Sequence, residues 1–383
     1  MKEKSLFIVS CFDEYNSRNK YVEEYFIKKG YKVKTFISDF HHQAKKYIQT
    51  APRKNVELIH GSSYSRNFSL SRIKHHYGFS CAVGKIIKKE KPDIVYANIP
   101  PNFISWYLGK CKKKGVISKL IFDIYDMWPE TMTFGKSSAL FQIPFSFWRK
   151  IRNKYINFAD LNITACKLHE EILRNQNIQK LYTLHLLKDK NLNISCIPIE
   201  YNLSEIKLCY LGTVNNIIDI EKICEIIKQI KKIRNVNLSF IGSGEAKNIF
   251  LRKVRQAGAS VNDYGVIYDD SEKEKILLSC HFALNVMKPQ VSVGVTLKSL
   301  EYFSCGLPVI NSIPCDTEEL VSKYNAGFNV SNGIENIVNM INGITSDVLY
   351  QMKKDTLRMF NENFSVEHFY VEFNSLIKTI IWD

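Results

Sequence analysis

Lys298 and Glu301 lie three residues apart, shortly after a turn that contains Gly294 and Thr296. Thr296 is a good N-cap, so the spacing predicts a short helix that starts there and stops at Gly306. Residues three apart share one helix face. Free N–H groups and the helix dipole attract phosphate to a helix N-terminus. A lysine and a carboxylate there could bind a ribose diphosphate, although a surface ion pair is the commoner meaning of this spacing.

Two glycine turns precede this segment in the chain. Gly212 and Thr213 follow an apolar run, and Gly242, Ser243 and Gly244 follow the next one. Without a Cβ, Gly212 would let the backbone approach phosphates, and Gly242 and Gly244 would let it approach a base or ribose. A lone G-x-G is more often only a turn.

The segment that starts at Thr296 resembles the C-terminal domain of GT-B glycosyltransferases, specifically the family-4-like retaining enzymes of bacterial surface polysaccharide and capsule assembly. The turns at 208–214 and 240–245 resemble segments that flank the nucleotide in the same family. In that family the glutamate of the motif holds the donor ribose. The matching motif positions are Thr296, Lys298, Glu301, Tyr302, Gly306, Pro308, Val309 and Ile310.

The resemblance implies an α/β fold with two Rossmann-like doubly wound domains that face each other across a cleft. It also implies a nucleotide-sugar site in the C-terminal domain. The donor-binding residues expected on this basis are Gly212, Thr213, Gly242, Ser243, Gly244, Tyr268, Gly294, Val295, Thr296, Lys298 and Glu301. Of these, Lys298 and Glu301 are assigned to catalysis.

The sequence departs from the family at three places. Val293 stands where much of the family has an earlier glutamate. Thr213 and Ile217 or Ile218 stand where many members have an arginine and a lysine for phosphate. The positive field is therefore expected from Lys298 and helix N-termini.

Four carboxylates in the N-terminal half are candidates for the acceptor side. The segment 125–131 resembles a D-L-W-P-E-S segment of the same family, and Asp126 and Glu130 follow a predicted strand there. Strand C-termini are where open α/β sheets bind ligands, so Asp126 is also a catalytic candidate. The alternative is that the segment only shapes a turn. Asp13 and Glu14 follow the first predicted strand, where a simple β–α connection is the alternative.

The elements that must position these residues alternate between strand and helix, as in a doubly wound sheet. Residues 1–195 are predicted as one domain, 206–345 as a second, and 346–383 as C-terminal helices that pack back toward the first. Strands are predicted at 5–10, 32–37, 93–97, 119–124, 161–164, 207–211, 237–241, 260–264, 282–286 and 308–311. Helices are predicted at 18–29, 83–90, 103–113, 146–158, 220–233, 247–257, 272–279 and 297–304.

The net charge of +15 is unevenly distributed. Residues 1–190 hold 34 Lys and Arg against 16 Asp and Glu, and the rest of the chain is slightly acidic. The charge predicts an anionic partner for the first half. Aromatic residues precede four basic ones in 141–154, which favours a peripheral contact with an anionic inner-membrane surface as much as an ordinary core helix. The sequence has no nucleic-acid-binding signature, no apolar run long enough to span a membrane and no signal peptide, so a cytoplasmic protein is expected.

The resemblance implies transfer of a hexose-type sugar, with retention, from a UDP- or GDP-sugar to a lipid-linked saccharide. No cofactor is expected, and no metal, since the ten cysteines and nine histidines show no ligand spacing. Three alternatives stay open: a nucleotide-sugar 2-epimerase, a degenerate homologue that binds nucleotide without transfer, and a nucleic-acid binder.

Overall fold

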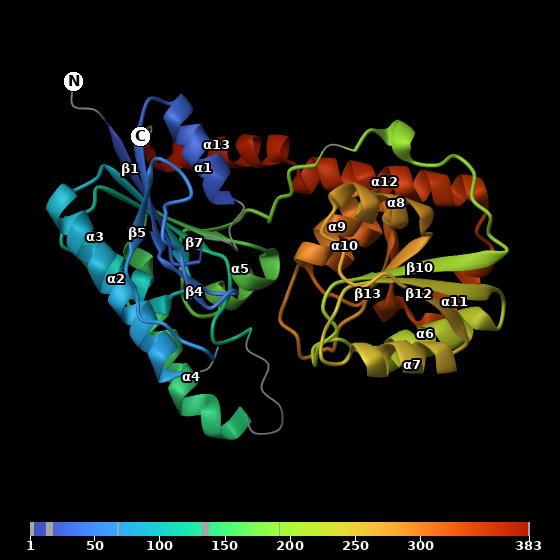
Figure 1. Ribbon diagram of the computed structural model, residues 1–383. Coiled ribbons are helices and arrows are strands. Elements are labelled where there is room, and N and C mark those ends of the chain that lie inside the picture. The colour runs from blue at the N-terminus through green and yellow to red at the C-terminus, as the bar shows by residue number, and fades with distance from the viewer. Residues whose placement is uncertain (1–3, 13–17, 67–68, 132–137, 191, 382–383) are drawn as a thin grey trace. The chain divides into compact units, whose positions relative to one another are not determined.

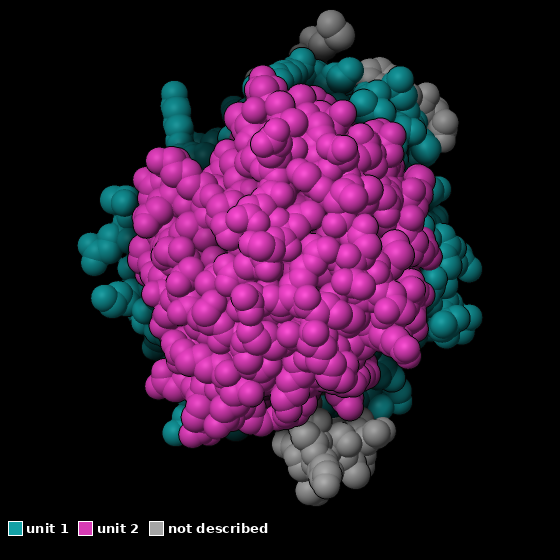
Figure 2. Space-filling model, turned by 90° about the vertical axis from the view of Figure 1, so that its right-hand side faces the viewer, with its two compact units in different colours: residues 1–186, 369–383 teal, residues 187–368 magenta. Residues whose placement is uncertain are grey.

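A computed structural model describes residues 4–12, 18–66, 69–131, 138–190 and 192–381. The chain divides into two compact units. Unit 1 contains residues 1–186 and 369–383, and unit 2 contains residues 187–368 (Figure 2). No helix in the described ranges is both long and apolar enough to cross a bilayer.

Unit 1 is built on a parallel sheet in the order β5-β2-β1-β6-β7-β8-β9. One face of the sheet packs on α2, α3 and α5, whose buried side chains belong to a single apolar core. Helices α1 and α13 lie elsewhere in the unit (Figure 1). The strands are β1 (Ser5–Ser10), β2 (Lys32–Ser38), β5 (Val56–Ile59), β6 (Ile94–Ile99), β7 (Lys119–Ile124), β8 (Leu161–Thr164) and β9 (Leu181–Thr183), with a small hairpin of β3 (Phe40–His41) and β4 (Lys46–Tyr47). The helices are α1 (Arg18–Lys28), α2 (Leu70–Glu90), α3 (Asn102–Lys113), α4 (Ser138–Asn153), α5 (Lys167–Arg174) and α13 (Val366–Ile381).

Unit 2 repeats the design with a six-stranded parallel sheet in the order β12-β11-β10-β13-β14-β15. The buried side chains of α6, α7, α11 and the start of α12 share one core with this sheet, while α9 and α10 each pack on α12. The strands are β10 (Glu205–Leu211), β11 (Asn235–Ile241), β12 (Ala259–Asp263), β13 (Phe282–Asn285), β14 (Val309–Asn311) and β15 (Gly327–Asn329). The helices are α6 (Ile220–Lys231), α7 (Lys247–Gln256), α8 (Asp270–Ser279), α9 (Leu297–Ser304), α10 (Asp316–Tyr324), α11 (Ile334–Asn342) and α12 (Ser346–Phe364).

The two parallel sheets confirm the predicted α/β class with two Rossmann-like domains, and most predicted elements are present within a few residues. The largest boundary error concerns α2, which begins at Leu70 rather than at 83. Ser69 caps its first turn by accepting from the Arg72 amide. Gly84 lies inside this longer helix, and a Cβ there would meet the Tyr107 ring at 2.1 Å, so the glycine permits close packing of α2 against α3. The elements that were not predicted include β5, β9, β15, α5, α10 and α11.

The two C-terminal helices do not pack as one segment. Helix α12 packs on α9 and α10 in unit 2. The part of α13 from Phe369 onward belongs to unit 1, where the Tyr25 hydroxyl donates to Asn374 at 2.8 Å and the Tyr25 and Phe373 rings lie 5.2 Å apart.

The strand order of unit 2 reverses beside β10, because β11 pairs on one side of it and β13 on the other. In open α/β sheets, ligands bind at the carboxyl ends of the strands at such a switch point. Gly212 directly follows β10, and the loop before α9 follows β13. The topology therefore brings the two segments singled out in the sequence to one edge of one sheet.

Candidate functional site

The loop before α9 is held in place by hydrogen bonds within unit 2. Thr296 caps the helix, with its Oγ1 accepting from the Ser299 amide at 3.1 Å. The Gly294 carbonyl accepts from the Thr317 amide at 3.2 Å and from the Thr317 hydroxyl at 2.5 Å, which ties the loop to α10. Val295 is buried. The N-terminus of α9 is thus fixed rather than frayed.

Tyr302 connects α9 with the end of β10. Its side chain is fully buried, and its hydroxyl oxygen accepts from the Leu211 amide at 2.7 Å. Burial raises the pKa of this phenol well above its ordinary value, so it stays neutral. The motif tyrosine therefore positions the strand end that carries Gly212.

Lys298 presents a buried ammonium group with no hydrogen-bond partner among the described residues. Its Nζ lies 5.1 Å from the centre of the Tyr210 ring, a cation–π contact. Burial lowers the pKa of Lys298 to about 8. A buried charge without a counter-ion is costly, and an anion that reached Nζ would remove that cost.

Glu301, one turn further on, is held by two lysines. Its Oε1 accepts from Lys188 Nζ at 2.6 Å, and its Oε2 lies 3.6 Å from Lys273 Nζ on α8. Oε2 is buried and accepts no hydrogen bond from the described residues. The carboxylate is therefore oriented through one oxygen, with the second available as an acceptor.

Sequence analysis missed Lys188 and Lys273. Neither belongs to a motif, and each reaches Glu301 only through the fold, from the segment before β10 and from α8. Together with Lys298 they place three ammonium groups around α9. The only sequence signal for these two lysines was indirect. Positions 213 and 217 hold Thr213 and Ile217 instead of basic residues, so the positive charge of the site had to come from other parts of the chain.

The glycine turns have a structural explanation that needs no ligand. A Cβ at Gly242 would meet the Gly212 carbonyl oxygen at 2.0 Å, and a Cβ at Gly244 would meet the Val214 carbonyl oxygen at 2.2 Å. Both glycines also have a positive φ, at 152° and 127°. Gly212, with a φ of 113°, has nothing within 4 Å of its would-be Cβ, so it leaves open space beside the turn.

Three other predicted donor residues are exposed. Thr213 and Ser243 lie at the tips of the two glycine turns. Tyr268 is 91% exposed. The structure brings together Gly212, the loop before α9, Lys298 and Glu301.

Asp126 makes the contacts of a turn residue. Its Oδ1 accepts from the Met127 amide at 2.7 Å and from the Thr131 hydroxyl at 2.6 Å. These contacts are local, as expected if the segment only shapes a turn.

Glu130 is engaged in a partly buried ion-pair network. Its two oxygens accept from the fully buried Arg152 at 2.8 and 2.9 Å, and Arg149 and Gln176 also donate to it. Burial alone would raise the pKa of Glu130, but hydrogen bonding and charge from Arg152 lower it overall. This carboxylate holds α4 against the turn. Asp13 and Glu14 lie outside the described residues.

Unit 1 also contains a buried polar cluster that the sequence reasoning missed. Arg18 and Asp123 form a fully buried ion pair, and the Tyr96 hydroxyl donates to Asp123 at 2.5 Å. Burial, then the Asp123 charge, raises the pKa of Tyr96 well above its ordinary value. A charged residue inside the apolar run of β7 was the available signal. The described residues contain no group of three or more His, Cys, Asp or Glu arranged to hold a metal ion.

Part of unit 2 is similar to a known protein family. Residues 205–347 match the sequence profile of the family described as glycosyl transferases group 1. This segment, which makes up most of unit 2, is therefore similar to group 1 glycosyl transferases. The matched range includes Gly212, Lys273, Lys298 and Glu301, whereas Lys188 lies outside it.

Solved glycosyltransferase structures resemble the whole chain at low sequence identity. The apo form of the lipopolysaccharide outer core galactosyltransferase WaaB superposes with a TM-score of 0.67 at 16% identity, covering 98% of this chain and 99% of WaaB. A glycosyltransferase from Rickettsia africae gives 0.65 at 13% identity, covering 100% and 99%. Anabaena HepE in complex with UDP-glucose gives 0.60 at 11% identity, covering 98% and 99%. No curated protein matches the sequence.

Proposed function

We propose that the chain is a GT-B glycosyltransferase that moves a hexose-type sugar from a UDP- or GDP-sugar to a lipid-linked saccharide, with retention, in surface polysaccharide biosynthesis. The similarity of residues 205–347 to group 1 glycosyl transferases supports the transferase activity, and the donor, the acceptor and the stereochemistry go beyond that similarity. UDP is the first candidate nucleotide, because the similar HepE structures contain UDP, glucose and UDP-glucose.

The donor site is proposed chiefly because the ammonium of Lys298 has no hydrogen-bond partner among the residues that the structure describes. It is buried beside a capped helix N-terminus, at the switch point of a parallel sheet. Helix N-termini and buried cations both favour phosphate, and here they coincide. A diphosphate would supply the counter-ion that the described residues do not.

Glu301 is proposed to hold the ribose. The hydrogen bond from Lys188 to Oε1 fixes the carboxylate, and Oε2 would accept from a ribose hydroxyl. Lys273 lies close enough to Oε2 to supply positive charge on the same side. The arrangement supplies an acceptor for the sugar and cations for the diphosphate within one turn of α9.

The reaction we propose needs no protein nucleophile. The bond between the anomeric carbon and the diphosphate oxygen breaks, and a bond to the acceptor hydroxyl oxygen forms on the same face. The hydroxyl proton passes to the departing diphosphate oxygen. Lys298 and the amides at the start of α9 stabilise the negative charge that develops there, which is the electrostatic contribution expected in such a step. Binding energy from the nucleotide holds the reacting groups together.

The acceptor proposal rests on charge. The first half of the chain carries the whole positive excess, and a lipid-linked saccharide and the anionic inner-membrane surface would both present phosphate to it. A cytoplasmic enzyme with peripheral membrane contact follows from this proposal.

The test is a donor and acceptor assay on purified protein. UDP-, GDP- and dTDP-sugars are offered with a membrane lipid extract, donor affinity is measured by calorimetry, and the anomeric configuration of the product is read by NMR. We expect one donor class to bind and one retained product. Glu301→Gln and Lys298→Met should each reduce turnover, whereas Lys231→Met on α6 should not.

The same assay separates the alternatives. Binding without transfer or hydrolysis would identify a degenerate homologue, and an isomerised donor sugar would identify a 2-epimerase. Undiminished transfer by Glu301→Gln would refute the role given to that carboxylate.

A further inference from the structure

The chain passes between the two units twice, and the segments of unit 2 next to both crossings contact each other. The first crossing lies between residues 186 and 187, and the second between 368 and 369. The Lys188 amide donates to the Phe364 carbonyl oxygen at 3.0 Å. This hydrogen bond joins the segment that follows the first crossing to the segment that precedes the second, and both belong to unit 2.

Two side-chain contacts attach these segments to α9. The Lys188 ammonium donates to Glu301 Oε1 at 2.6 Å. The Phe364 ring stacks on the Phe303 ring, with their centres 5.9 Å apart. The side chains of Lys188 and Glu301 are each 22% exposed, so water screens this ion pair less than it screens a pair on the open surface. The helix that carries the donor carboxylate is therefore attached to both segments.

Lys190 gives the first segment an anchor that does not involve Glu301. Its ammonium pairs with Glu274 Oε2 on α8 at 2.8 Å, and it also donates to Cys305 Sγ at 3.3 Å. Because this anchor remains when Lys188 is replaced, the loss of Lys188 should release the carboxylate from the segment without detaching the segment from unit 2.

The second crossing follows a short break between two helices. Helix α12 ends at Phe364 and α13 begins at Val366, and Ser365 between them has an extended backbone. The Ser365 hydroxyl donates to the Asn361 carbonyl oxygen at 2.7 Å and accepts from the His368 amide at 3.1 Å. Hydrogen bonds at a helix end open more readily than those inside a helix, so amide exchange here reports how firmly the segment is held.

We propose that Lys188 is a positioning residue that couples the Glu301 carboxylate to both crossings, so that a ribose bound by Glu301 changes how firmly the two segments are held. The inference rests on the proposed function for the ribose. A ribose hydroxyl would fix the carboxylate through Oε2, and the fixed carboxylate would hold Lys188 through Oε1. Since coupling between two sites is reciprocal, a variant that releases the crossings should also bind the donor more weakly.

Lys273 offers a matched comparison, because it faces the same carboxylate from another part of the fold. Its ammonium lies 3.6 Å from Glu301 Oε2 and pairs with Asp270 on the same helix, α8, at 2.6 Å. Lys273→Met therefore removes a positive charge from beside Glu301 but leaves the contacts of Lys188 and Phe364 in place. An effect of charge alone should appear in both lysine variants, and an effect transmitted through residues 187–190 should appear only in Lys188→Met.

The experiment measures amide hydrogen exchange of the full chain by mass spectrometry, with and without saturating UDP. We expect UDP to slow exchange in residues 187–190 and 364–368 of the wild type by about fivefold, at the lower end of the usual range for coupled sites. Lys188→Met should abolish this response and should raise the Kd for UDP by about tenfold, as measured by calorimetry. Lys188→Arg can still donate to Oε1 and should restore most of both effects, whereas Lys273→Met should keep the exchange response.

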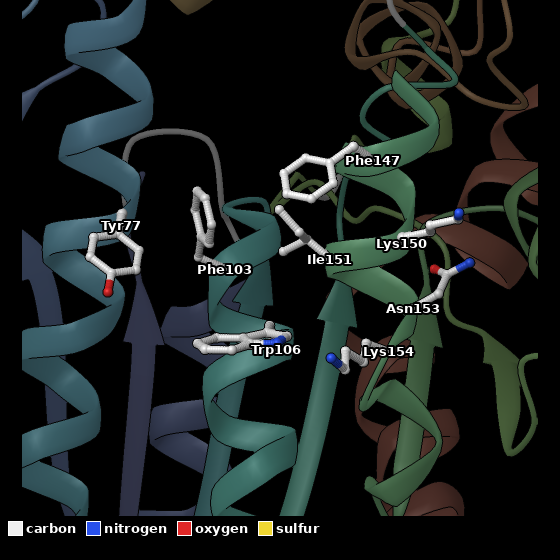
Figure 3. A pocket seen from close by; sticks show the side chains of 8 residues that line it. All are labelled: Tyr77, Phe103, Trp106, Phe147, Lys150, Ile151, Asn153 and Lys154. Carbon is white, nitrogen blue, oxygen red and sulfur yellow. The ribbon is translucent and has the colours of Figure 1, made fainter. Parts of the chain in front are cut away.

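Three controls separate this coupling from other effects. Lys150 is exposed in unit 1, where it lines an apolar groove together with Trp106 and Phe147 (Figure 3), and Lys150→Met should behave as the wild type does. Thermal unfolding of Lys188→Met should give a Tm close to that of the wild type, because Lys190 still anchors the segment. Saturating 2′,3′-dideoxy-UDP lacks the hydroxyls that Glu301 would bind, so it should not slow exchange at the crossings.

The coupling is overturned if UDP binds the wild type without slowing exchange in either segment, or if Lys188→Met keeps the full response. It is also overturned if Lys273→Met loses the response as completely, since the effect would then be one of charge alone. The ligand-free chain gives an independent test: Lys188→Met and Glu301→Gln should both speed exchange in residues 187–190, and an unchanged rate would refute the coupling. A wild type that binds no UDP refutes the donor site, and the ligand-free comparison then decides the coupling by itself.

Discussion

Replacing Lys298 with methionine should stabilise the ligand-free protein while weakening donor binding. Burial lowers the pKa of this lysine from 10.5 to about 8, which corresponds to about 3 kcal/mol against the charged form in the fold. At pH 7 the group is charged in both the folded and the unfolded chain, so the fold carries that cost. Methionine has a similar length and no charge. It loses the contact with the Tyr210 ring, worth about 0.5–1 kcal/mol.

The expected net gain is about 2 kcal/mol, which for a unit of this size raises Tm by about 2–4 °C per kcal/mol. The gain should depend on pH. Between pH 8 and 10.5 the unfolded chain binds more protons at Lys298 than the folded chain does, so wild-type stability rises with pH and the advantage of the variant disappears. Urea unfolding at pH 7 and pH 10.5, followed by fluorescence, measures both values.

Donor affinity should change in the opposite direction. Loss of one partner from a buried charge pair weakens UDP binding by about a hundredfold. If Lys298→Met destabilised unit 2, the ammonium group would have a partner in the fold. Unchanged UDP affinity would show that phosphate does not reach it. Lys231→Met, on the exposed face of α6, controls for loss of a lysine as such.

Three further changes test other parts of the structure. Wild-type UDP affinity should fall above pH 8 as Lys298 loses its proton, and calorimetry across pH 7–9.5 would refute this by showing a flat profile. Glu130→Ala leaves the buried Arg152 without its carboxylate and should cost about 3–5 kcal/mol at pH 7 by urea unfolding; the contribution should vanish as the pH falls below 4.5, because the pKa of Glu130 is lowered in the fold. Gly242→Ala should lower Tm far more than Gly333→Ala, because both have positive φ but only the first would place a Cβ 2.0 Å from a backbone oxygen; equal effects would contradict this packing argument.

Local chemistry made α9 predictable from sequence. Thr296 as an N-cap and Gly306 after the last turn define α9 by rules that act within a few residues, and the helix has the predicted bounds. The alternation of apolar strands and helices likewise predicted two parallel sheets. Element ends were less predictable where long-range packing overrides local preference, as at Gly84 in α2.

The partners of charged side chains were not predictable in this way. Lys188 lies 113 residues before Glu301, and no periodicity relates the two. From the sequence, Glu130 was a candidate ligand-binding residue, but the structure shows that it accepts a hydrogen bond from Arg152 of α4. The exposure of Leu70, Ile73 and Tyr77 was equally unpredictable, because their spacing is that of any amphipathic helix. Only the structure shows that these three side chains are exposed.

The two unsatisfied groups on α9 are the strongest argument that this helix binds a ligand. Lys298 Nζ and Glu301 Oε2 are both buried, both lack a hydrogen bond from the described residues, and lie one turn apart. Each is costly when left alone, and native proteins keep few such groups. They could have satisfied each other as an ion pair, since residues three apart can meet on a helix. Instead, Lys188 and Lys273 approach the carboxylate while Lys298 faces the Tyr210 ring, so the fold keeps a cation and an acceptor apart. A ligand with an anionic part and a hydroxyl-bearing part, such as a nucleoside diphosphate, would satisfy both at once.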